Sequence, residues 1–307
     1  MRMGSMRFAY YCLANILDDS REHQWIQSIR SLRMYNRFIP VWLFLFNTAS
    51  SGLLREAERH NVRVRFLGDY EEFLQRAHPR GSALAFYPTF HKFGVLAQLP
   101  LPSLTQLLYL DCDTFFFGDV TVLFDHHASS DWYAREEPTS VGSPFPYDPR
   151  HVDENLLKDI ARKKNLRYIP PFNSGVCLLN HQVWHRLIAV YETYLRFAWR
   201  LLCGRELSGD ESARHFSGWA AVLDSLSDSE RAEALPYPSK NHWIIEQIAL
   251  WLTLGSLQRF SLGWFQPRLV VQGNEFESMV EPHGCCVVAH YFSGGEGNFF
   301  SRFPALT

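Results

Sequence analysis

Short apolar runs alternate with longer amphipathic stretches over the first 110 residues of the chain. The runs are bounded by polar or turn residues, as in buried strands, whereas the stretches between them repeat apolar residues at helical spacing. The pattern predicts strands at 8–13, 41–46, 62–66 and 107–110, and helices at 19–35, 53–60, 70–77 and 91–99. Strands and helices that alternate in this way form a mostly parallel sheet with helices on both faces, so we expect an α/β fold.

The second half of the chain departs from this alternation in two places. Residues 136–171 are rich in proline and charge, and we expect a flap or excursion there. Residues 181–240 predict a helical insertion that begins with an amphipathic helix at 183–203. The regular pattern returns with a helix at 243–254 and a strand at 287–290.

Length and composition favour one large domain over residues 1–307. A chain of 307 residues that is 47% hydrophobic can bury about three quarters of its unfolded surface, so it needs no disulfides. The six cysteines are scattered apart from Cys285-Cys286, and none has the Cys-x-x-Cys spacing of a zinc or redox site. We therefore expect a reducing compartment, the cytoplasm.

Charge and hydropathy exclude two classes of partner. A formal net charge of −2 argues against a nucleic-acid partner or a polybasic membrane footprint. Residues 1–7 are polar and precede a strand pattern, which is unlike a secretory signal. The stretch 183–203 contains charged residues throughout, so we expect no transmembrane segment; peripheral contact of its apolar stripe with a membrane stays open.

Two aspartates, Asp111 and Asp113, directly follow the apolar run 107–110. Parallel sheets bind ligands at the carboxyl ends of their strands, and on an extended backbone both side chains of such a pair point the same way. Two carboxylates there are costly to bury unless a cation neutralises them, and their oxygens suit a hard divalent metal that binds a diphosphate. The pattern therefore predicts a metal and nucleotide site. The alternative is a pair that only caps a turn.

Three later segments complete a recognisable order: the predicted turn Phe172-Asn173-Ser174-Gly175-Val176, Glu246-Gln247, and His290. With Tyr109-Leu110-Asp111-Cys112-Asp113, this order resembles the retaining family 8 glycosyltransferases, the group that contains glycogenin and the bacterial lipooligosaccharide galactosyltransferases. That family has an Asp-x-Asp after an apolar strand, a Phe-Asn-[Ser/Ala]-Gly-Val turn, an Asp-Gln helix start and a late histidine. The resemblance covers about residues 6–300 and implies a GT-A fold, Rossmann-like, with 181–240 as an insertion.

The resemblance implies a role for each segment. Asp111, Asp113 and His290 are expected to hold Mn²⁺, or Mg²⁺, which bridges the two phosphates of a nucleotide sugar. Glu246 and Gln247 are expected beside the transferred sugar as the catalytic residues. The expected donor-binding residues are Cys12, Ala14, Asn15, Lys92, Asp111, Cys112, Asp113, Asn173 and Ser174.

Several of these residues also have a simpler interpretation. Lys92 could be a solvated lysine on a helix surface, and a lone histidine after an apolar strand, such as His290, is more often a core residue with its hydrogen bonds satisfied. An Asn-Ser-Gly turn at 173–175 needs no ligand to explain it, although its glycine permits close backbone approach to one.

The chain departs from the family pattern in two places. The family's His-x-x-Gly-x-x-Lys-Pro-Trp loop becomes the segment 290–298, which lacks the lysine, and Arg302 is a hypothetical replacement for that cation. Glu246 stands where the family has aspartate and adds one methylene near the sugar, so retention or inversion of configuration stays open.

These observations predict a metal-dependent hexosyltransferase that moves a hexose from a UDP-sugar to a hydroxyl acceptor, which is a glycan, a protein or a small molecule. One alternative is a phosphatase of the haloacid-dehalogenase type, in which Asp111 is the nucleophile and Asp113 the acid and base. That motif normally lies on the first strand, whereas Asp111 follows about three βα units. A second alternative is a catalytically inactive protein that only binds a sugar nucleotide.

Overall fold

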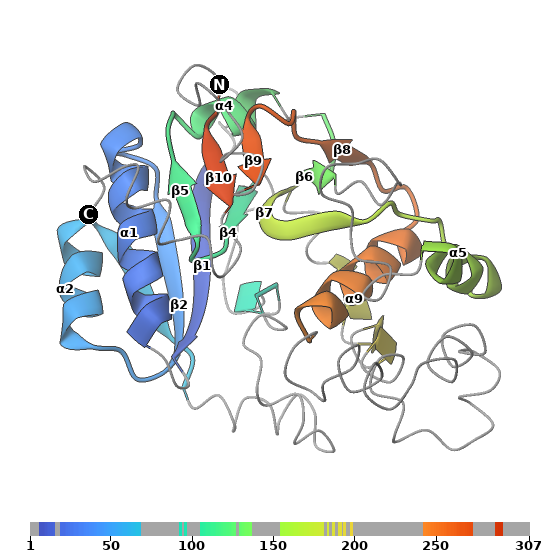
Figure 1. The fold of residues 1–307 in the computed structure, drawn as a ribbon, viewed down its shortest axis with the longest axis horizontal. Coiled ribbons are helices and arrows are strands. Elements are labelled where there is room, and N and C mark those ends of the chain that lie inside the picture. The colour runs from blue at the N-terminus through green and yellow to red at the C-terminus, as the bar shows by residue number, and fades with distance from the viewer. Residues whose placement is uncertain are drawn as a thin grey trace, which may run out of the picture. The chain divides into compact units, whose positions relative to one another are not determined.

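The computed structural model of the protein comprises two compact units (Figure 1). The first unit is formed by residues 1–135, 174–184 and 261–307, and the second by residues 136–173 and 185–260. The structure describes residues 6–15, 19–68, 92–93, 95–96, 105–126, 129–136, 154–180, 242–272 and 286–290, and single positions between 183 and 198. The predicted helix at 70–77, residues 137–153 of the flap, residues 199–240 of the insertion and the segment after His290 lie outside these residues.

A seven-stranded sheet has the strand order β3-β2-β1-β4-β7-β6-β8. Its strands are β1 (Met6–Asn15), β2 (Val41–Asn47), β3 (Val62–Phe66), β4 (Thr105–Leu110), β6 (Trp132–Glu136), β7 (Phe172–Asn180) and β8 (Leu262–Trp264). The pairs β1/β2, β2/β3, β1/β4 and β6/β8 are parallel, and β4/β7 is antiparallel. The predicted mostly parallel sheet is therefore confirmed.

A second, three-stranded sheet has the order β5-β10-β9. It brings residues 288–290 beside residues 114–116, which lie far away in the sequence. Its strands are β5 (Thr114–Phe116), β9 (Val270–Gln272) and β10 (Val288–His290). Strand β10 is parallel to β9 and antiparallel to β5, and the register places His290 opposite Thr114. Because β5 begins directly after Asp113, this register brings His290 next to the aspartate pair.

Helices α1 (Asp19–Tyr35) and α2 (Ser51–Arg59) pack on one face of the large sheet. The buried residues of α1 follow a helical stripe, and they meet alternate residues of β1 because side chains on a strand alternate between faces. This core contains Trp25, Ile29, Leu32, Leu53, Ala57, Ala9, Tyr11 and Leu13. The opposite face of the sheet carries aromatic rings, with Tyr109 centred 5.1 Å from Tyr10 and 5.4 Å from Phe93. A short helix, α4 (Thr121–His126), follows β5.

The second unit contains helices α5 (Glu154–Lys163) and α9 (His242–Ser256). Every residue of α9 from 246 to 255 is buried, as expected for a helix that is apolar on most of its surface. Its Trp251 indole donates a hydrogen bond of 3.2 Å to the Phe172 carbonyl, and the Arg167 amide donates one of 3.0 Å to the Gly255 carbonyl.

Within the described part of the chain, no helix is long and apolar enough to cross a bilayer.

The sequence predicts most of these elements at their observed positions. Helix α1 and strand β3 have the predicted bounds, 19–35 and 62–66. The predicted turn at 172–175 is wrong, because these residues are the first four of β7, which lies between β4 and β6 and is buried up to Leu179. The predicted α-helix at 91–99 is also wrong at the four positions that the structure describes: residues 92–93 form a turn and residues 95–96 a 3₁₀ segment. Glycine at position 94 weakens an α-helix there.

Candidate metal centre

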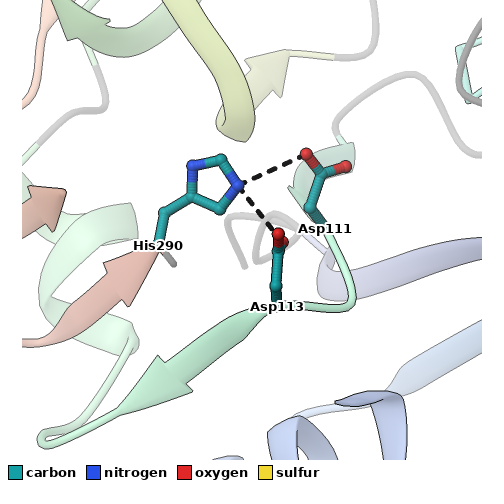
Figure 2. Close-up of side chains that lie close together, drawn as sticks. All are labelled: Asp111, Asp113 and His290. Carbon is teal, nitrogen blue, oxygen red and sulfur yellow. Dashed lines mark ion pairs between the residues drawn. The ribbon is translucent and has the colours of Figure 1, made fainter. Parts of the chain in front are cut away.

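Asp111 and Asp113 lie in a tight turn that joins β4 to β5. The Asp111 amide donates a 2.8 Å hydrogen bond to the Gly175 carbonyl of β7, and the Thr114 hydroxyl donates one of 2.8 Å to the Asp111 carbonyl. The prediction of an extended backbone is wrong for this pair, since Cys112 and Asp113 are turn residues. The turn itself directs both carboxylates toward one imidazole nitrogen (Figure 2).

That imidazole belongs to His290, the last residue of β10. Its Nε2 lies 3.5 Å from Asp111 Oδ2 and 3.2 Å from Asp113 Oδ1 (Figure 2). The ring is packed against Gly175: a Cβ at this position would lie 2.2 Å from His290 Cε1, closer than any real contact. Glycine is therefore required here by the histidine ring, which differs from the predicted close approach to a sugar.

The three groups determine one another's charge. Burial by itself would lower the pKa of His290, but the neighbouring Asp113 and Asp111 carboxylates raise it to about 10. Burial would raise the pKa of Asp111, but Lys92 and His290 hold it well below its usual range. At neutral pH His290 is thus an imidazolium beside the two aspartates, an arrangement in which a divalent cation can replace the imidazole proton.

The donor set fits a divalent metal ion. Asp111, Asp113 and His290 each offer one ligand atom, and these atoms lie within 4.8 Å of one another. Carboxylate oxygens suit hard cations such as Mn²⁺ and Mg²⁺, and an imidazole nitrogen suits transition metals. The side chains of the aspartates are 24% and 20% exposed, so oxygens of a second molecule can reach the same ion from solvent.

Lys92 is buried beside this cluster. Its Nζ donates hydrogen bonds to the Ser174 hydroxyl at 2.7 Å and to the Ser174 carbonyl at 3.3 Å, and lies 3.9 Å from Asp111 Oδ1. With a side-chain exposure of 2%, the interpretation of Lys92 as a solvated helix lysine is wrong. An ammonium group is costly to bury without such partners, so the lysine adds a fixed positive charge to the edge of the centre.

The remaining predicted donor residues of the first unit lie along β1 and in the turn. Cys12 shares the strand face of Tyr10, and burial raises its pKa to about 12, with Lys92 and Asp111 near enough to act on it in opposite directions. Burial and the adjacent carboxylates also raise the pKa of Cys112, which packs on the core. Both thiols are therefore neutral at physiological pH. Ala14 and Asn15 end β1 and pair with Phe46 and Asn47 of β2.

Three predicted residues belong to the second unit. Asn173 is the buried second residue of β7. Glu246 and Gln247 are buried on α9, with exposed fractions of 2% and 5%. Their contacts with a donor sugar stay predictions. The role of Arg302 as a cation for the diphosphate also stays a prediction, because Arg302 lies outside the described residues.

Sequence reasoning missed two sets of residues that hold the centre in place. The Tyr109 hydroxyl donates a hydrogen bond to Asp111 Oδ1. The sequence carries a signal for this contact, because Tyr109 lies two residues before Asp111 and side chains at that spacing share one face of a strand. The Thr114 hydroxyl lies 3.1 Å from the Ser28 hydroxyl, which lies 2.9 Å from that of Tyr11. No local pattern links Ser28 of α1 to a turn 83 residues later, at Asp111.

Neither a protein-family model nor a curated protein matches the sequence. Among solved structures, the galactosyltransferase LgtC, in complex with donor and acceptor sugar analogs, is similar at 14% identity and a TM-score of 0.50, over 98% of this chain and 95% of that chain. Mouse xyloside xylosyltransferase 1 is similar at 13% identity and a TM-score of 0.46, over 92% and 97% of the two chains. The glycosyltransferase GlyE of Streptococcus pneumoniae is similar at 13% identity and a TM-score of 0.49, over 95% of this chain and 55% of that chain. The likeness to LgtC and the strand topology show that this chain has the GT-A fold, an α/β Rossmann-like arrangement around a mostly parallel sheet.

Proposed function

We propose that this protein is a metal-dependent glycosyltransferase that moves a hexose from a UDP-sugar to a hydroxyl acceptor, with retention of anomeric configuration. The observation that carries the proposal is the convergence of Asp111, Asp113 and His290 at the edge of a sheet with GT-A topology. The glycosyltransferases of similar fold, LgtC among them, support transfer of a sugar as the reaction class.

In this proposal Asp111, Asp113 and His290 hold Mn²⁺ or Mg²⁺. When bound, the ion stabilises the negative charge that develops on the diphosphate leaving group. The protein's contribution is to fix the three ligand atoms on two neighbouring strand ends, so that the donor is oriented as well as neutralised. Lys92 adds a positive charge that is already desolvated and held by Ser174.

The other donor contacts are assigned by the family resemblance. We assign Cys12, Ala14 and Asn15, at the carboxyl end of β1, to the base and ribose, because ligands of parallel sheets bind at this edge. Cys112 contributes with its flanking aspartates. We assign the sugar hydroxyls to Asn173 and Ser174, and the reacting carbon to Glu246 and Gln247.

The proposed organisation is one GT-A domain over 1–307, in which the excursion 136–171 and the insertion 181–240 supply the acceptor side. The acceptor is a hydroxyl group on a glycan, a protein or a small molecule. Cys12, Cys112, Cys177 and Cys286 are free thiols, which supports a reducing compartment, and we propose the cytoplasm.

A donor panel tests the proposal. The purified chain is incubated with UDP-hexoses, with and without Mn²⁺, and release of UDP and the configuration of the freed or transferred sugar are followed by NMR. We expect Mn²⁺-dependent consumption of one UDP-hexose with the α configuration kept in the product. An inverted product would contradict the assignment of retention, and binding of UDP without turnover of any donor would favour the inactive binding protein.

The same preparation is tested for the phosphatase alternative with an aryl phosphate and Mg²⁺. We expect no release of phosphate, because Asp111 follows the fourth strand of the chain and is hydrogen-bonded by Tyr109 rather than free to attack. Magnesium-dependent hydrolysis would overturn the proposal in favour of that alternative.

A further inference from the structure

The two carboxylate oxygens of Asp111 face different partners. Oδ2 is directed at His290 Nε2, 3.5 Å away, on the side of the proposed metal. Oδ1 accepts the hydrogen bond of the Tyr109 hydroxyl and lies 3.9 Å from Lys92 Nζ. For Asp113, by contrast, the structure describes an ion pair with His290 and, among the other described residues, neither a side-chain hydrogen bond nor a lysine at its carboxylate.

Tyr109 and Lys92 are themselves fixed. Both are almost fully buried, with exposed fractions of 2% and 1%, and the lysine Nζ lies 4.9 Å from the centre of the tyrosine ring, where a cation is attracted to the π face. Lys92 is further held by two hydrogen bonds to Ser174. A hydrogen-bond donor and a cation, from separate segments of the chain, thus converge on a single oxygen atom.

We infer that Tyr109 and Lys92 position Asp111 for metal binding by holding Oδ1, so that Oδ2 alone is offered to the ion. The inference rests on the proposed function, because it concerns the same metal centre. Tyr109 and Lys92 are positioning residues: they act through Asp111 and do not ligate the ion. Hydrogen bonds of this kind behind a metal ligand typically change metal affinity by about 10- to 100-fold, because they fix the ligand's orientation before the ion arrives.

Tyr109→Phe is the cleanest variant, since it removes one donor and leaves every charge in place. Removing the Lys92 charge would instead have two opposing effects, a freer carboxylate and a more negative site. Tyr133→Phe is the matched control, because Tyr133 is a buried tyrosine whose hydroxyl bonds with the Ser129–Ser130 segment, at 2.9 and 3.0 Å, and β6 carries none of the proposed metal ligands.

Calorimetric titration of MnCl₂ into wild type and both variants, at saturating UDP, measures the effect. We expect Tyr109→Phe to bind Mn²⁺ about 10- to 100-fold more weakly than wild type, and Tyr133→Phe to match wild type within about twofold. Equal affinities of Tyr109→Phe and wild type, or an equal loss in Tyr133→Phe, would overturn the inference while leaving the proposed function intact. A wild-type protein that binds no Mn²⁺ would overturn the proposed function, and the inference with it.

Asparagine variants give a second test that does not depend on Tyr109→Phe folding. The donors at Oδ1 would attract the amide oxygen of Asp111→Asn and turn its NH₂ group toward the ion. We therefore expect Asp111→Asn to bind Mn²⁺ no better than Asp111→Ala, whereas Asp113→Asn, free to rotate, retains more affinity than Asp113→Ala. If Asp111→Asn keeps the same advantage over alanine as Asp113→Asn does, Asp111 is not held and the inference is wrong.

Discussion

The turn that carries Asp111 and Asp113 is held from two sides by different chemistry. On the side of its carboxylates lie charged groups, the Lys92 ammonium and the His290 imidazolium. On the side of its backbone lie neutral hydroxyls: Thr114 bonds the Asp111 carbonyl and Ser28 bonds Thr114. One side of the turn is thus an ionic cluster and the other a chain of hydrogen bonds.

This contrast separates the groups proposed to bind the ion from the groups that stabilise the fold. Charges brought together in a partly buried site are costly unless they balance, so the ionic side responds strongly to a cation or a change of pH. The hydroxyl side has its donors and acceptors matched, with Ser31 also bonded to Phe116 and to the Ser28 carbonyl, and it contributes mainly to stability. Changes on the hydroxyl side should therefore alter stability with little effect on metal binding, whereas changes on the ionic side should alter both.

Asp113→Ala gives the largest expected effect, on the ionic side. Loss of a ligand that supports several kcal/mol of leaving-group stabilisation should lower donor turnover about a thousandfold. Without metal the midpoint of thermal unfolding should also fall, because Asp113 stabilises the buried imidazolium of His290. Asp125→Ala, which removes an exposed carboxylate on α4, is the control for turnover. Turnover of Asp113→Ala at the wild-type rate would contradict the assignment of the ionic side.

Gly175→Ala should break both sides of the comparison at once. Its methyl group would lie 2.2 Å from His290 Cε1, so the ring must shift away from the two carboxylates. We expect an unfolding free energy lower by about 2 kcal/mol, typical of overpacking, together with weakened Mn²⁺ binding. Gly118→Ala is the matched control, because a Cβ there meets its nearest atom at an ordinary 3.5 Å. Chemical denaturation that shows equal stability for the two variants would contradict the packing argument.

The pH dependence sharpens the comparison because only the ionic side titrates. Burial disfavours the imidazolium of His290, but Asp113 and Asp111 raise its pKa from 6.5 to about 10. Its contribution to stability without added metal is therefore fully present below pH 6.5 and is lost as pH rises toward 10. Mn²⁺ must displace the same proton, so its affinity should rise about tenfold per pH unit over this range. Calorimetry at several pH values measures this slope, and a flat profile would contradict the protonated state of His290.

Thr114→Val gives the smallest expected effect on the ion, because it acts on the hydroxyl side. It keeps the shape of the side chain and removes the hydrogen bonds to Ser28 and to the Asp111 carbonyl. We expect a loss of about 1 to 2 kcal/mol in unfolding free energy and a change in Mn²⁺ affinity of less than about threefold. Denaturant titration measures the change in unfolding free energy, and calorimetry measures the change in Mn²⁺ affinity. A loss of Mn²⁺ affinity as large as that of Gly175→Ala would show that the two sides are not separable.

The fold was predictable where local pattern and packing agree. Apolar runs and helical stripes indicate β1, β2, β3 and α1, because each of these elements has one consistent buried pattern in the sheet. The segment 172–175 was not predictable as strand, since Asn173, Ser174 and Gly175 are turn formers by local preference. Their place between β4 and β6, and the ring of His290 against Gly175, are decided by contacts far apart in sequence.

The candidate site likewise contains residues that were predictable from the sequence and residues that were not. The candidate metal ligands could be named from the Asp-x-Asp pattern and the family resemblance, and the structure brings the three side chains together. The groups that hold them could not be named, because Ser28 meets Thr114 only through the packing of α1 on the sheet. Lys92 was named, but its burial against Ser174 and Asp111 depends on β7 lying beside β4.

In the proposed site, Asp111, Asp113 and His290 bind a divalent ion together with the diphosphate of a nucleotide. Calorimetric titration of UDP into wild type and Asp113→Ala, each with and without Mn²⁺, is the decisive experiment. We expect Mn²⁺ to tighten UDP binding to wild type by at least about tenfold and to have no effect on Asp113→Ala. Equal affinity of wild type for UDP with and without Mn²⁺ would contradict it.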